Sequence, residues 1–172
     1  MRYFYDTEFI EDGKTIDLIS IGIVAEDGRE YYAISKEFNE CKASDWVQEN
    51  VITQLPPKYI IDNESSGSII QNKLYKSRFV IKNEILRFIG DDKPEFWAYY
   101  ADYDHVVLCQ LFGTMMDLPD GWPMYTRDLK QLCDEVGNPK LPKQQTGEHN
   151  ALDDALWVKD MYIRLARLAV RP

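Results

Sequence analysis

The feature that most constrains the fold is a pair of strand-like segments near the N-terminus, followed by a tight-turn signal. Residues 2–9 are rich in aromatic side chains, and residues 16–25 are almost continuously apolar, which is typical of a strand buried on both faces. Glu26–Gly28 contains an Asp-Gly pair, whose positive backbone angles suit a hairpin. Residues 29–35 then return as a third strand, so we predict that three antiparallel strands open the domain.

The rest of the chain predicts helices around at least one further strand. Apolar periodicity and capping residues place the expected helices at residues 44–55, about 69–89, 104–112, 126–135 and 150–168, and the expected strand at residues 95–101. Residues 58–68 are polar and Gly/Ser-rich toward their end, which indicates a surface loop. Leading strands followed by alternating elements predict a mixed α/β domain, with helices packed on a central sheet.

Length and composition narrow the class of protein. The 172 residues suit one domain spanning 1–172. No apolar run approaches the roughly 20 residues that a bilayer span needs, and the N-terminus carries acids where a signal peptide would be apolar. We therefore expect a cytoplasmic protein with no membrane partner. The three cysteines form no C-x-x-C pair, which argues against a zinc knuckle or a disulfide framework.

The net charge of −9 disfavours tight, metal-free binding of nucleic acid. An acidic chain can still act on a polyanion if its carboxylates bind divalent cations, because the ions then become the largest local charges. Residues 67–90 differ from the rest, with a local charge of +4. Their basic residues either guide a phosphate backbone or form a solvated helix face, and they are Lys73, Lys76, Arg78, Lys82 and Arg87.

The first chemical motif is Asp6-Thr7-Glu8 on the first expected strand. Strand side chains alternate, so Asp6 and Glu8 point to one face. Two neighbouring carboxylates repel each other and are costly to bury unless a cation compensates them. The alternative is that this face of the sheet is exposed to solvent.

The second motif, residues 98–108, ends the expected fourth strand with Asp102 and Asp104. An acid at a strand-to-helix junction is an ordinary N-cap. That interpretation accounts for one of the two aspartates and leaves the other for chemistry.

The third motif, residues 147–157, contains His149 and Asp154. On one continuous helix these two residues would be about 140° apart, so they converge only if His149 precedes the helix. Asn150 is a strong N-cap type, and Asp153 is placed to complete a capping box. Asp154 then has no structural task, although His149 can also be an ordinary polar surface residue.

The order of these three motifs resembles the DEDDh group of 3'-5' exonucleases in the RNase H-like superfamily. The segments YDTEFIEDG and LISIGIVAEDGREYYA are closer still to the small ribonuclease AS-like exoribonucleases. The resemblance covers nearly the whole chain and implies an RNase H-like mixed sheet flanked by helices. It departs at Tyr99–Ala101, where many relatives carry an asparagine.

The resemblance implies roles for particular residues. Four acids match the family's metal ligands, and they are Asp6, Glu8, Asp104 and Asp154. Two Mg²⁺ ions, for which Mn²⁺ can substitute, would bind the attacking water and the leaving 3' oxygen. His149 matches the general base, and an imidazole can accept a proton near neutral pH. Phe9, after the D-x-E motif, is expected either to stack on the terminal base or to pack in the core.

The function implied is a metal-dependent 3'-5' exoribonuclease that releases 5'-mononucleotides from single-stranded RNA. A preference for adenylate-rich 3' ends and a homodimer are implied only by the ribonuclease AS-like resemblance. One alternative is a 3'-5' exonuclease acting on DNA or short oligonucleotides, because one sequence does not expose contacts to the 2'-OH. The other is a non-catalytic RNA-binding or protein-interaction module on the same fold, against which the five intact chemical positions argue.

Overall fold

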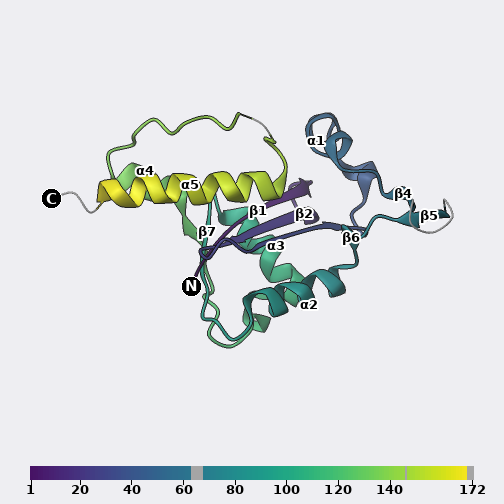
Figure 1. The fold of residues 1–172 in the computed structure, drawn as a ribbon, viewed down its shortest axis with the longest axis horizontal. Coiled ribbons are helices and arrows are strands. Elements are labelled where there is room, and N and C mark those ends of the chain that lie inside the picture. The colour runs from purple at the N-terminus through teal and green to yellow at the C-terminus, as the bar shows by residue number, and fades with distance from the viewer. Residues whose placement is uncertain (63–67, 146, 170–172) are drawn as a thin grey trace.

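The structure is a computed structural model that describes residues 1–62, 68–145 and 147–169. A six-stranded sheet in the order β6-β3-β2-β1-β7-β8 forms its centre (Figure 1). The strands of this sheet are β1 (Arg2–Glu11), β2 (Ile16–Ala25), β3 (Glu30–Ser35), β6 (Tyr75–Lys76), β7 (Glu95–Ala98) and β8 (Arg127–Asp128). The helices are α1 (Asp45–Asn50), α2 (Arg78–Ile89), α3 (Asp102–Phe112), α4 (Leu129–Glu135) and α5 (Ala151–Ala169).

The three leading strands pair as the sequence predicts. β1 runs antiparallel to β2, and β2 runs antiparallel to β3. β1 also pairs in parallel with β7, through Arg2–Phe4 against Glu95–Trp97. The sheet is therefore mixed, and helices flank it, which confirms the mixed α/β prediction.

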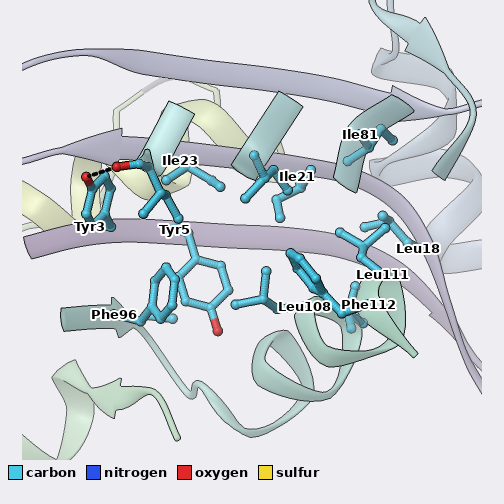
Figure 2. Close-up of a cluster of buried hydrophobic side chains, with 14 of the residues drawn as sticks. Tyr3, Tyr5, Leu18, Ile21, Ile23, Ile81, Phe96, Leu108, Leu111 and Phe112 are labelled. Atoms are coloured by element: carbon cyan, nitrogen blue, oxygen red, sulfur yellow. Dashed lines mark hydrogen bonds between the residues drawn. The ribbon is translucent and has the colours of Figure 1, made fainter. Parts of the chain in front are cut away.

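The two faces of the sheet carry different helices (Figure 1). Tyr3 and Tyr5 of β1 point into a core that α2 and α3 complete (Figure 2). Phe4, on the opposite face, packs with α4 and α5. Gly22 on β2 allows α5 to approach closely, because a Cβ there would lie 2.3 Å from the carbonyl oxygen of Ala151. The start of α5 is thereby seated directly on the sheet.

Two sequence-based expectations are wrong between residues 58 and 77. The expected loop over 58–68 instead begins a hairpin of β4 (Tyr59–Asp62) with β5 (Ser68–Gln71), and residues 63–67 lie outside the described part. The expected helix over 69–89 begins only at Arg78, where the Ser77 side chain accepts the N–H of Val80. Ile70 pairs with Ile60 across the hairpin. The four-residue spacing of Ile70 and Leu74 matches one face of a helix, although Ile70 lies on a strand.

Two other helices are shorter than expected. α1 begins after the predicted N-cap Ser44 but ends at Asn50, and Ile52–Gln54 continue as a 3₁₀ turn. α4 begins at Leu129 because Asp128 caps it and accepts the N–H of Lys130. In the described ranges, no helix combines the length and hydrophobicity that crossing a membrane requires.

Candidate active site

Three carboxylates meet where β1 passes under the first turn of α5. Asp6 and Glu8 share a face of β1 with Phe4, which is the face that α5 covers. Asp154 lies in the first turn of α5. One oxygen from each of Asp6, Glu8 and Asp154 lies within 4.8 Å of the others, and all three side chains are half-buried. The structure thus brings together three of the four predicted acids.

Asp104 lies next to this group but is held by the backbone of β1. β7 pairs with β1 only as far as Phe4, so beyond that point the edge of β1 is open to α3. Asp104 Oδ1 accepts the N–H of Thr7 at 2.8 Å and its hydroxyl at 2.6 Å. The side chain is buried, and its position is fixed by the strand that carries Asp6 and Glu8.

Neither aspartate of the second motif is an N-cap, which corrects the sequence-based interpretation. The N-cap of α3 is Ala101, which makes no side-chain capping bond. Asp102 is exposed in the first helical turn. Asp128 instead accepts the N–H groups of Tyr100 and Ala101 at 3.3 and 3.2 Å, so this acid from a distant segment fixes the entry to α3.

His149 precedes α5, as convergence with Asp154 requires. Its φ angle of +70° turns the chain, and its backbone N–H donates to Asp154 Oδ2 at 3.1 Å. The imidazole packs edge-to-face against Trp46 of α1, with ring centroids 4.8 Å apart. Trp46 is 53% exposed, and local sequence patterns did not reveal its contact with His149.

The predicted capping box at α5 is half correct. The Asn150 side chain accepts the N–H groups of Leu152 and Asp153 at 3.1 and 3.3 Å. The N–H of Asn150 donates to the carbonyl of Gly147 at 2.9 Å, not to Asp153. The Asp153 carboxylate lies against Gly147, where a Cβ would come within 2.2 Å of it and where φ is +74°. Asp153 is therefore outside the acidic group.

Burial raises the pKa of each of these four carboxyls, and repulsion within the group raises the pKa of Asp6 and Glu8 further. Burial is the main cause of the raised pKa of three of these groups. The pKa is about 8 for Glu8, about 7 for Asp104 and about 6 for Asp154. Burial also raises the pKa of Asp6 well above its usual range, and the charges of Asp104, Glu8 and Asp154 raise it further. Bonds from Thr7 to Asp104, and from Gln144 and His149 to Asp154, oppose the rise. Divalent cations would favour the ionised forms of this group.

Phe9 follows a bulge between Glu8 and Phe9 that interrupts the β1–β2 register. It is half-buried, packs against the α2–α3 core, and meets Tyr103 edge-to-face at 5.7 Å. His105 on α3 is half-buried and bonds Thr126 Oγ1 at 3.1 Å. The same hydroxyl bonds Tyr5 at 2.6 Å, so His105 ties α3 to β1.

A cleft of about 660 Å³ extends from the acidic group along α4 and α5. Asp6, His149 and Asp154 line one part of it. Its other polar and aromatic lining residues include Tyr99, Lys130, Lys140, Lys143, Gln144 and Trp157. Trp157 follows Asp154 by three residues, a spacing that places both side chains on one face of a helix. This spacing is the sequence signal that could have indicated Trp157 as a neighbour of the acidic group.

A model of the 3'-5' exoribonuclease Rv2179c-like domain matches residues 1–164. The chain belongs to this family. Two curated relatives, the 3'-5' exoribonucleases Rv2179c and MT2234.1 of two Mycobacterium tuberculosis strains, are each 49% identical over 158 residues, which is 90% of this chain and 87% of theirs. The Rv2179c-like family confirms the prediction at the level of a 3'-5' exoribonuclease family.

A solved structure of the yeast NOT1 MIF4G domain co-crystallised with CAF1 contains a chain with a TM-score of 0.48. That chain is 17% identical, and the match covers 98% of this chain and 79% of the other. This likeness is too weak to bear on function.

Proposed function

We propose that this protein is a metal-dependent 3'-5' exoribonuclease of the DEDDh type with an RNase H-like fold. It releases 5'-mononucleotides stepwise from the 3' ends of single-stranded RNA. One observation carries the proposal: in a chain of the Rv2179c-like exoribonuclease family, Asp6, Glu8 and Asp154 converge within 4.8 Å beside His149.

The donor set fits two Mg²⁺ ions, for which Mn²⁺ can substitute. Hard cations of this kind prefer carboxylate oxygens, and the site offers three of them in one group. Asp104 is the fourth acid, close enough for its charge to raise the pKa of Asp6 and Glu8. When bound, such ions supply Lewis-acid activation of water and neutralise charge at the scissile phosphate.

The protein's own groups orient the reaction. His149 accepts the proton of the attacking water, as a general base positioned beside the acidic group. Asp154 accepts the backbone N–H of His149, so one residue joins the acidic group to the base. Trp46 packs against the imidazole and restricts its rotation. Phe9, beyond Glu8 on β1, offers a face on which the terminal base can stack.

Finer properties follow from the resemblance rather than from the geometry. We propose a preference for adenylate at the 3' end, a homodimer, a single catalytic domain over 1–172 and a cytoplasmic location. Competition among RNA homopolymers tests the base preference, and light scattering tests the homodimer. Limited proteolysis tests the single domain, and cell fractionation tests the cytoplasmic location.

Product analysis tests the proposed function. A linear, 5'-labelled, single-stranded RNA with Mg²⁺ is expected to give a ladder shortened from the 3' end, and 5'-mononucleotides. A 3'-phosphate is expected to slow degradation strongly, and a circular RNA should resist it. Efficient cutting of the circle would show a different kind of nuclease. Faster degradation of DNA of the same sequence would favour the DNA alternative, and no degradation would favour a non-catalytic binding module.

A further inference from the structure

The cleft beside the acidic group lies on the opposite side of that group from Phe9. Along β1 the order is Phe4, Asp6, Glu8 and Phe9. Asp6 lines the cleft, which continues toward Trp157 and Val158 of α5, and Val158 packs with Phe4. The cleft therefore extends toward the start of β1, whereas Phe9 follows its acidic part. A strand of nucleic acid crossing the site would lie on both sides of the acids.

Three lysines line the cleft, together with the carboxyls of Asp6, Glu148 and Asp154. Lys140 and Lys143 are exposed on the segment between α4 and α5. In the portion of the chain that the structure describes, no ion pair joins either lysine to a carboxylate, whereas Lys130 pairs with Asp134. Two cationic side chains thus remain available to phosphate groups at the rim.

The basic stretch singled out in the sequence does not offer an equivalent surface. Arg78 pairs with Asp17, and Lys76 pairs with Glu84 at 2.6 Å. Helix α2, which carries most of this stretch, lies on the other face of the sheet from α5 (Figure 1). Its charges are consequently either neutralised locally or placed away from the acidic group.

Two aromatic side chains line the same cleft. Trp157 lies one helical turn after Asp154, and its indole N–H donates to the carbonyl of Pro142 at 3.0 Å. This bond ties the lysine-bearing segment to α5. Tyr99 meets Trp157 edge-to-face at 5.2 Å and is half-buried. Aromatic rings beside cationic side chains are the combination that single-stranded nucleic acid binds through stacking and charge.

We propose that this cleft binds the single-stranded RNA segment on the 5' side of the scissile phosphate. Lys140 and Lys143 contact its phosphodiester backbone, and Tyr99 stacks on a base. The inference rests on the proposed function, because the acidic group must hold the scissile phosphate for the cleft to receive the upstream nucleotides.

Equilibrium binding separates this inference from catalysis. Fluorescence anisotropy with a 12-nucleotide, single-stranded RNA is measured in Mg²⁺ on an Asp154→Asn background, so that turnover does not intervene. Adding Lys140→Ala and Lys143→Ala is expected to weaken binding about 10- to 30-fold at roughly 0.1 M salt, and to reduce the salt slope by about 1.4. Adding Tyr99→Ala instead should weaken binding about fivefold or more with an unchanged slope.

The matched control removes two cations that lie outside the cleft. Lys73→Ala with Arg87→Ala changes the net charge equally, at exposed positions in the β5–β6 turn and on α2, and should leave affinity and slope unchanged. Equal losses of RNA affinity in the Lys140/Lys143 variant and in the control variant would overturn the inference. Unchanged affinity of the Lys140/Lys143 variant, or no RNA binding by the Asp154→Asn background protein, would also overturn it. Hydrolysis by the wild-type protein is assayed separately, so its absence would refute the proposed function rather than the cleft.

Discussion

The two halves of the Tyr3–Glu8 stretch of strand β1, Tyr3–Tyr5 and Asp6–Glu8, have opposite effects on the stability of the fold. In the first half, Tyr3 and Tyr5 are fully buried, and both pack against Phe96, with ring centroids 6.2 and 5.7 Å apart. In the second half, Asp6 and Glu8 place two carboxyls on one face beside Asp154. The first half contributes apolar burial and aromatic packing, whereas the second adds repulsion.

This difference places the stability cost at Asp6 and Glu8, the residues to which a catalytic role is assigned. Asp6 and Glu8 are half-buried, and no cationic side chain among the described residues pairs with them, which breaks the rule that buried charges are paired. Such violations are expected at functional sites. Divalent cations would supply the missing charge.

The largest effect is expected at the third carboxylate. Asp154→Asn keeps the shape but removes a charged ligand and weakens the acceptor for the His149 N–H, so turnover should fall by at least about 10³-fold. RNA degradation and melting temperature are measured together. A variant that is inactive because it has unfolded, or one that stays active, would contradict the assignment.

The next effect concerns the base. His149→Ala should lower the rate about 10²- to 10⁴-fold while metal binding, measured by calorimetry with Mn²⁺, is largely kept. Near-normal turnover would return His149 to the role of a surface residue packed on Trp46.

Stability should respond with opposite sign in the two halves of the Tyr3–Glu8 stretch. Tyr3→Ala removes a ring packed on Phe88 and Phe96 and is expected to cost about 3–5 kcal/mol of unfolding free energy. Glu8→Gln in metal-free protein, measured above about pH 8 where the Glu8 carboxyl is ionised, removes repulsion and should stabilise the fold. Urea titration measures the unfolding free energy of both variants. Destabilisation by Glu8→Gln would show that the carboxyl group does not lower the stability of the fold.

A smaller effect is a pH dependence of the metal-free protein. The folded pKa of Glu8 is about 8, of Asp104 about 7 and of Asp154 about 6, so between about pH 4 and about pH 8 the folded state binds more protons than the unfolded state. The unfolding free energy should therefore fall by several kcal/mol as pH rises through this window, because one pKa unit corresponds to about 1.4 kcal/mol. Saturating Mg²⁺ should reduce the fall, and an equal fall with the ion present would argue against metal binding here.

The smallest effect is expected one residue before Asp154. Asp153 lies against Gly147 outside the acidic group, so Asp153→Asn should cost at most about 1 kcal/mol and keep most activity. If Asp153→Asn were inactive and Asp154→Asn active, the assignment within the third motif would be wrong.

Local patterns were enough to predict much of the fold and the acidic group. The Asp-Gly turn and the apolar run of β2 predicted the leading sheet, and strand alternation placed Asp6 and Glu8 on one face. The five-residue spacing of His149 and Asp154 required a histidine outside the helix, and the structure places it there.

Features that depend on distant segments could not be predicted this way. The bond between Asp104 and Thr7 depends on where β7 leaves β1. The β4–β5 hairpin was missed because Ile60 and Ile70 pair across a turn, which apolar spacing along one segment does not reveal. The cleft joins Tyr99 to residues 138–144, which meet only in the folded chain.

A Mg²⁺ titration of metal-stripped protein acting on 5'-labelled, single-stranded RNA tests the proposed metal-dependent activity most directly. The carboxylate group formed by Asp6, Glu8 and Asp154 should require cations for function. We expect no shortening in excess EDTA and a 3'-to-5' ladder that is restored by Mg²⁺ or Mn²⁺. Undiminished degradation in EDTA, after removal of bound metal, would contradict this metal dependence.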